Sequence, residues 1–165
     1  MKKAKSKLKL PGKNDGEYLE DGLAEELQTE KSSSFYYRRL FDTHTAGKGM
    51  PPQPADFDIA WFGYGSCHME CKTSESTTSR LVKFSQLGDM LRWGKAGKPG
   101  LVLVHFYNLQ SLYIFNVADI KNTTAPSWVV PEIPHSWAIQ GGVITGIVKV
   151  IKERMKWEYE RLFGK

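Results

Sequence analysis

The sequence contains no long hydrophobic run. A helix that crosses a membrane needs about 20 consecutive, mostly apolar residues, and no stretch of the 165 residues approaches that length. The basic N-terminus is not followed by the apolar segment that a secretory signal peptide requires. These absences argue against the membrane-spanning and secreted classes, and we expect a cytosolic protein.

Cysteine is also scarce. The chain has two cysteines, Cys67 and Cys71, within one predicted strand. Four residues along a strand, at roughly 3.3 Å per residue, separate them by about 13 Å, which is too far for a disulfide or a shared metal ion. The sequence therefore predicts neither a disulfide framework nor a zinc site built from Cys67, His68 and Cys71.

Positive charge is in modest excess. Lys and Arg number 23 against 18 Asp and Glu, so the net charge is +5. This charge fits a polyanionic partner, although many basic proteins have none. A hydrophobic content of 41% in 165 residues suits one domain with a buried core. Residues 1–14 are rich in lysine, which predicts a flexible basic arm that either aids solubility or contacts DNA.

Acidic residues gather in a predicted strand-turn-strand unit over residues 54–72. Side chains two apart on a strand share a face, so pairing of the strands can bring Asp56, Asp58, Glu70 and Lys72 to one end of a sheet. Carboxylates that converge from separate strands beside a lysine suit a divalent-metal site for phosphodiester hydrolysis. In the alternative interpretation, these acids only pair with nearby arginines and lysines.

The tripeptides Pro54-Ala55-Asp56 and Glu70-Cys71-Lys72 lie at the two ends of this unit. An acid at the start of one strand, followed by Glu-x-Lys on the next, resembles the PD-(D/E)xK nuclease superfamily, although Glu-x-Lys alone also occurs on solvated strands. The resemblance implies an α/β restriction-endonuclease-like fold, in which helices flank a mixed central β-sheet. It also implies metal-dependent hydrolysis of DNA.

The resemblance assigns roles to the charged residues. Asp56 and Glu70 would bind one or two Mg²⁺ ions, with Mn²⁺ as an alternative. Asp58 is a second or auxiliary candidate ligand, because it shares a face with Asp56. Lys72 would orient or help deprotonate the attacking water. His68 shares the face of Glu70, at a position where relatives usually have an apolar residue.

Two further features resemble the archaeal-type Holliday-junction resolvases of this superfamily. Gly16, Glu20, Leu23 and Leu27 match the spacing of the first helix in that family, which makes Glu20 a candidate further metal ligand. Gln86 occupies the place of a glutamine that opens a later helix and faces the active site. For Glu20 and Gln86 alike, a plain surface role is the alternative.

The same resemblance implies four-way DNA junctions as the substrate. Two symmetric cuts are needed to resolve a junction, and one small chain delivers one cut, so we expect a homodimer. A nicking or restriction-type endonuclease on duplex DNA is the alternative among enzymes, and a non-catalytic basic DNA-binding module is the alternative outside them. The candidate DNA contacts are Arg38, Arg39, Lys48, Arg80 and Lys83.

The predicted nuclease core covers residues 15–120, and residues 121–165 form a C-terminal extension that packs on the core or on a dimer partner. The expected elements are a helix over 15–27, strands over 33–41, 54–61 and 67–72, a helix over 84–93, strands over 100–107 and 111–116, and a helix over 151–163. The apolar run 101–104 predicts a central strand that is buried on both faces. His105 in that strand is expected to be a core or rim residue rather than a ligand.

Overall fold

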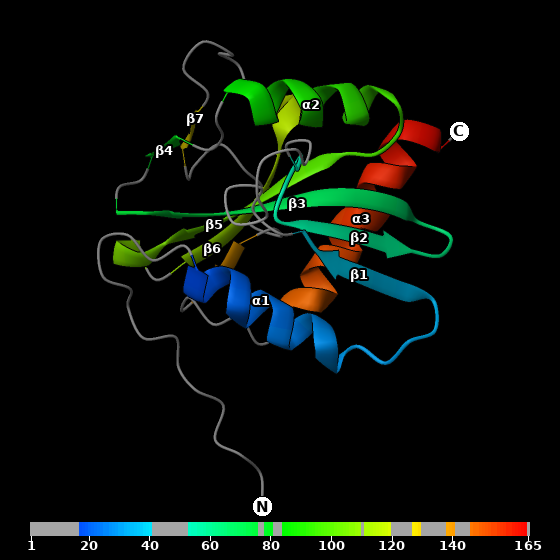
Figure 1. Ribbon diagram of the computed structural model, residues 1–165, viewed down its shortest axis with the longest axis horizontal. Coiled ribbons are helices and arrows are strands. Elements are labelled where there is room, and N and C mark those ends of the chain that lie inside the picture. The colour runs from blue at the N-terminus through cyan, green and yellow to red at the C-terminus, as the bar shows by residue number, and fades with distance from the viewer. Residues whose placement is uncertain are drawn as a thin grey trace, which may run out of the picture.

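The computed structural model of the chain describes residues 17–40, 53–75, 78–80, 84–109, 111–119, 127–129, 138–140 and 146–164. Within these residues, three α-helices pack around β-structure (Figure 1). The helices are α1 (Glu17–Thr29), α2 (Phe84–Lys95) and α3 (Ile147–Phe163). None of these described helices is long and apolar enough to cross a membrane. Gly16 of the predicted helix motif lies outside the described residues.

The larger sheet has six strands among the described residues, in the order β1-β2-β3-β5-β6-β8. Their bounds are β1 Phe35–Arg39, β2 Phe57–Trp61, β3 Gly65–Ser74, β5 Gly100–Phe106, β6 Ser111–Asn116 and β8 Ala138–Gln140. β3 and β5 run parallel, and the other neighbouring pairs run antiparallel, so the predicted mixed sheet is confirmed. A parallel pair needs a crossover, and α2 lies in that connection. β4 (Thr78–Arg80) and β7 (Ser127–Val129) pair separately.

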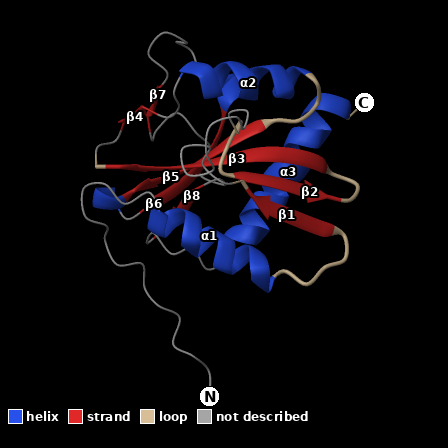
Figure 2. Cartoon of the chain, viewed as in Figure 1, coloured by secondary structure: helices blue, strands red, loops and turns tan. Residues whose placement is uncertain are grey.

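The helices divide between the two faces of the larger sheet (Figures 1 and 2). Leu19, Leu23 and Leu27 recur every four residues, so they share one side of α1, where all three are fully buried. They pack with α3 and with inward residues of the strands, such as Phe57 and Met69. α1 and α3 therefore cover one face with a common hydrophobic core.

α2 covers the opposite face. Its buried residues Leu87 and Met90 pack against alternate residues of β5 and β6. Every residue of β5 is buried, which confirms the central strand predicted from the apolar run. Gly100 at the start of β5 is in close contact with its surroundings, because a Cβ there would lie 2.9 Å from Cβ of Met90 and from Cγ2 of Val117. The missing side chain lets β5 approach α2.

β2 and β3 form the predicted hairpin. Residues 62–64 make the turn, and Gly63 and Gly65 have φ angles of 86° and 76°. These angles lie in the left-handed region that favours glycine. Cys67 and Cys71 on β3 are both buried and free.

Part of the α2 side of the sheet is solvent-exposed. Tyr36 and Arg38 alternate on β1 with residues that pack into the α1 core, so they point to the α2 side. Tyr36 is 63% exposed, and the side chain of Arg38 is 62% exposed. Their partners in register on β2 are Ala60 and Asp58. We call these four residues the open face.

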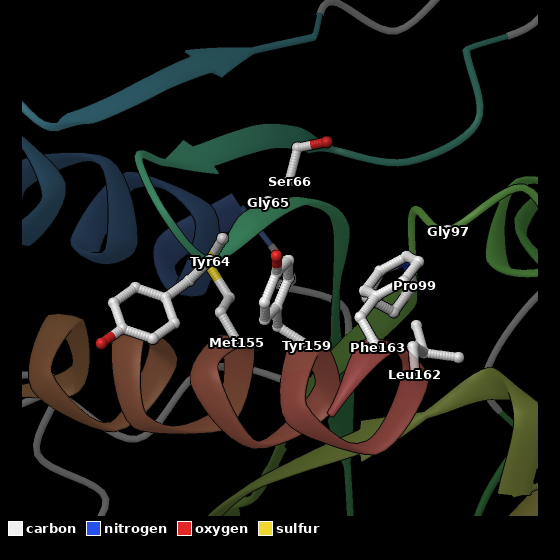
Figure 3. Close-up of a pocket in the computed structure, with 9 residues that line it drawn as sticks. All are labelled: Tyr64, Gly65, Ser66, Gly97, Pro99, Met155, Tyr159, Leu162 and Phe163. Atoms are coloured by element: carbon white, nitrogen blue, oxygen red, sulfur yellow. The ribbon is translucent and has the colours of Figure 1, made fainter. Parts of the chain in front are cut away.

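α3 starts earlier than predicted, at Ile147. Ile151 and Met155 of α3 are buried, whereas Tyr159 and Leu162 are exposed near the end of the helix. There the helix borders a small pocket with the β2–β3 turn and with residues 97–99 (Figure 3). α3 and β8 both come from the predicted C-terminal extension; α3 shares the buried cluster of α1, and β8 extends the sheet.

The predicted elements, a helix, three strands, a helix, two strands and a C-terminal helix, correspond in order to α1, β1 to β3, α2, β5 and β6, and α3. The second helix continues through Gly94 to Lys95, beyond its predicted end at residue 93. Gly97, with a φ angle of 89°, follows it. The strands β4, β7 and β8 were not predicted, because three residues each are too few for a periodic pattern.

Candidate active site

The first carboxylate is placed by the pairing of β2 with β3. Phe57 pairs with Met69, so Asp56, one residue before β2, lies next to the segment of β3 that carries Glu70. The Asp56 N–H donates to the Met69 carbonyl at 3.2 Å. The Cys71 N–H donates to Oδ2 of Asp56 at 2.7 Å. These two hydrogen bonds fix the carboxylate of Asp56 beside the strand that carries Glu70.

The second carboxylate, Glu70, is 1% exposed. Its Oε1 lies 2.6 Å from Nζ of Lys72 and accepts a hydrogen bond from Nε2 of Gln86 at 3.4 Å. Its Oε2 is buried and has no hydrogen-bond partner among the described residues. A buried oxygen without a partner is destabilising, and it indicates a place for a cation or water. We call Asp56, Glu70, Lys72 and Gln86 the carboxylate site.

The pKa values reflect burial and mutual repulsion. Burial, and next the charge of Glu70, raise the pKa of Asp56 from 3.8 to about 6. Burial also raises the pKa of Glu70, against the lowering effect of Lys72. Burial alone lowers the pKa of Lys72, but the charge and hydrogen bond of Glu70 outweigh burial, so the pKa of Lys72 is raised. Lys72 is therefore a cation at neutral pH.

Glu20, the candidate further ligand, is bound by an arginine. Nη2 of Arg39 lies 2.9 Å from Oε2 of Glu20, and Nη1 lies 2.6 Å from Oδ1 of Asp21. Burial and the charge of Asp56 raise the pKa of Glu20, while Arg39 lowers it. Glu20 is thus within electrostatic range of the carboxylate site, but its carboxylate is engaged by Arg39.

Asp58 lies outside the carboxylate site. Its Oδ1 is 2.6 Å from Nζ of Lys98, and its Oδ2 is 3.8 Å from Nη2 of Arg38. The strand register pairs it with His68, one step along the same face from Glu70. Since both of its oxygens already have cationic partners, we do not include Asp58 among the proposed metal ligands.

The carboxylate site fits Mg²⁺. This ion is usually bound by one or two carboxylates, several waters and substrate phosphate oxygens. Asp56 and Glu70 provide two carboxylates, and Oε2 of Glu70 has no partner among the described residues. Within the same residues, no group of three or more Asp, Glu, His or Cys side chains is arranged to bind a metal ion. This donor set leaves the remaining positions to water and phosphate.

The predicted DNA contacts have different surroundings. Lys48 and Lys83 lie outside the described residues. Arg80 belongs to β4, whose side chains are not described. Arg39 is bound to two carboxylates of α1, whereas Arg38 is exposed on the open face. Of the five, Arg38 is the described side chain best placed for a ligand.

A group of side chains next to the carboxylate site was not predicted. Lys98 pairs with Asp58, and its Nζ lies 5.7 Å from the ring centroid of Trp93. The rings of Trp93 and His68 meet edge to face, with centroids 5.6 Å apart. Burial, and next the charge of Lys98, lower the pKa of His68 to about 4. The only sign of this group in the sequence was His68, at a position where relatives usually have an apolar residue.

His105 is part of the core rather than of the site. It is buried, and its Nδ1 is hydrogen-bonded to the hydroxyl of Tyr18 on α1. Burial lowers the pKa of His105. Its position agrees with the expected core or rim residue.

No protein-family model and no curated protein sequence matches this chain. Among solved structures, the chain is similar to Hjc, a Holliday junction resolvase from the archaeal hyperthermophile Archaeoglobus fulgidus. The TM-score is 0.47 and the identity is 17%, over 67% of this chain and 84% of that chain. At this distance the function has to be argued from the site itself.

Proposed function

We propose that the protein is a metal-dependent endonuclease that hydrolyses phosphodiester bonds of DNA. The observation that carries this proposal is the environment of Glu70. One carboxylate oxygen contacts an ammonium, the other is buried without a partner among the described residues, and the charge of Glu70 raises the pKa of Asp56. An ion pair that serves only stability needs neither the second carboxylate nor the unpaired oxygen.

Asp56 and Glu70 would bind Mg²⁺, with Mn²⁺ as a substitute. A divalent ion in such a site neutralises charge on the phosphate and lowers the pKa of a bound water. Glu20 is the candidate third carboxylate, because its pKa is raised by burial and by Asp56. The raised pKa values of Asp56 and Glu70 agree with a site that binds a cation.

The chain's own residues position the reactants and stabilise charge. The Cys71 N–H orients Asp56, and the Gln86 amide orients Glu70. The charge and hydrogen bond of Glu70 raise the pKa of Lys72, so Lys72 is a hydrogen-bond donor at neutral pH. We therefore assign Lys72 to orienting the attacking water and stabilising negative charge that develops on phosphorus.

For the substrate, we propose four-way junctions cut by a homodimer. The helix motif around Glu20 and the contact between Gln86 and Glu70 favour a resolvase over other nucleases of the superfamily. Two symmetric cuts then require twofold symmetry.

The proposal is tested by incubating the purified protein with four-way junction, flap and linear duplex DNA, in Mg²⁺, in Mn²⁺ or in a chelator. We expect cleavage in metal, no cleavage in chelator and a preference for the junction. Glu70→Gln should eliminate cleavage while DNA affinity is kept or improved, because carboxylates without a metal repel phosphate. Cleavage by this variant at the wild-type rate would refute the proposal.

Other outcomes would favour the alternatives. Equal cleavage of linear duplex, or a monomer by light scattering, would favour a nicking or restriction-type endonuclease. Salt-dependent DNA binding without cleavage in any metal would favour a non-catalytic basic module, in which the acids only pair with cations.

A further inference from the structure

One side of α2 follows the strand that carries Glu70. Gln86 and Trp93 are seven residues apart, close to two helical turns, so they lie on the same side of the helix. Gln86 contacts Glu70, and Trp93 contacts His68, two residues earlier on the same face of β3. Trp93 therefore lies along the same row of the sheet as the carboxylate site.

Trp93 combines exposure with neighbouring cations. Its side chain is 49% exposed, although one edge meets His68. Lys98 lies over the indole ring, and Arg38 is on the open face, on the other side of Asp58. An exposed aromatic ring next to a cation, with a second cation nearby, is typical of sites for unpaired nucleic acid, where bases stack on the ring and cations contact the backbone.

We infer that Trp93 is a stacking surface for a DNA base that lies about three nucleotides from the cleaved phosphate. Seven helical residues at about 1.5 Å each place Trp93 roughly 10 Å from Gln86 along α2. About three stacked nucleotides, at roughly 3.4 Å each, span the same length. Lys98 and Arg38 would contact the phosphates near that base. The inference rests on the proposed nuclease function and adds a residue that determines specificity.

The inference gives a physical basis for shape selectivity. A base inside a continuous duplex is covered on both faces by its neighbours, so it presents no face to Trp93. A base at a branch point, a nick or an unpaired position has a free face. Stacking on such a base is tolerant of sequence, because every base has a π-face. Trp93 would thus hold the cleaved phosphate at a fixed distance from the base whose face is free.

The competing explanation is that Trp93 only covers His68, whose ring nitrogens are buried without partners among the described residues. Two variants separate these roles. Trp93→Phe keeps an aromatic ring, and Trp93→Leu keeps an apolar cover without one. Trp157→Leu is the matched control, because Trp157 is an exposed tryptophan near the guanidinium groups of Arg154 and Arg161 on α3. Thermal melting establishes that each variant is folded.

The first test measures binding in a chelator with Glu70→Gln protein. The DNA is a duplex with one unpaired 2-aminopurine, whose fluorescence is quenched by stacking. Trp93→Leu should lose the quenching and about 5- to 100-fold in affinity for this DNA, with little change for continuous duplex. Trp93→Phe should keep most of the quenching and of the affinity. Trp157→Leu should behave like the Glu70→Gln protein without a second substitution. Unchanged quenching and affinity in Trp93→Leu would overturn the inference.

The second test measures cleavage while an unpaired position is moved stepwise along a duplex. With Trp93 present, the cut should move with the unpaired position and stay at a constant distance from it. In Trp93→Leu, cleavage should continue, but this distance should no longer be constant. A constant spacing in that variant would contradict the inference. Absence of cleavage by the wild-type protein on every DNA would instead reject the proposed function, and the binding test would still decide the role of Trp93.

Discussion

Asp56→Asn should stabilise the metal-free protein at neutral pH. Burial, and next the charge of Glu70, raise the pKa of Asp56 from 3.8 to about 6. The folded protein therefore binds this proton more tightly than the unfolded chain does. The resulting contribution to the free energy of unfolding is fully present below the unfolded pKa and is lost as the pH rises through about 6. Asparagine removes the charge that causes the loss.

The size of the effect follows from the two pKa values. A difference of about 2 units, at about 1.36 kcal/mol per unit, makes ionised Asp56 unfavourable by about 3 kcal/mol at neutral pH. Asparagine also weakens the hydrogen bond from Cys71, since the acceptor becomes neutral, which offsets about 1 to 2 kcal/mol. The net gain of about 1 to 2 kcal/mol should raise Tm by about 2 to 8 °C for a chain of this size.

Calorimetry in a chelator, from acidic to neutral pH, measures the effect. The Tm values of the wild type and of Asp56→Asn should converge towards acidic pH. Saturating Mg²⁺ should raise the Tm of the wild type alone. Asp58→Asn is the matched control, because the same change there removes ion pairs to Lys98 and Arg38 and should leave Tm unchanged or lower it. An Asp56→Asn protein that melts at or below the wild type at neutral pH would refute the argument from repulsion.

Three further outcomes are expected. Glu20→Gln should reduce cleavage by roughly 10- to 100-fold, whereas Glu25→Gln, at an exposed position of the same helix, should cleave at the wild-type rate; equal rates would remove Glu20 from the site. Lys72→Ala should lower kcat by roughly 10²- to 10³-fold while calorimetry still detects Mg²⁺ binding, and an unchanged kcat would contradict its role. Gly100→Ala should lower the free energy of unfolding by about 1 to 3 kcal/mol, because a Cβ there would crowd Met90; an unchanged urea midpoint would show that the neighbouring atoms adjust freely.

Local patterns in the sequence predicted most of the fold. The acidic strand-turn-strand unit, the helix after it and the apolar strand at residues 101–104 all appear in the structure. Each is set by periodicity, glycine or a run of apolar residues, which act over short distances along the chain. The proximity of Gln86 to Glu70 was suggested by a family pattern, since no local signal relates the two positions.

Long-range contacts were beyond sequence reasoning. Periodicity placed Asp58 on the face of Asp56, but its partner Lys98 lies forty residues later, in the segment before β5. On α3, Arg154 and Glu158 stand four residues apart, both are buried, and their ion pair measures 2.6 Å. Burial depends on which segments meet in three dimensions, and charge patterns alone do not encode it.

In the proposed metal site, Arg39 would make the third carboxylate, Glu20, available only when substrate is bound. Its guanidinium binds Glu20 and Asp21, and the same planar fork is well matched to a phosphate. A substrate phosphate that binds Arg39 would free the Glu20 carboxylate to bind the proposed metal ion. By thermodynamic reciprocity, DNA then raises the affinity for Mg²⁺ by the same factor as Mg²⁺ raises the affinity for DNA. The hydrolytic centre would be assembled cooperatively on its target, and the protein without DNA would bind metal only weakly.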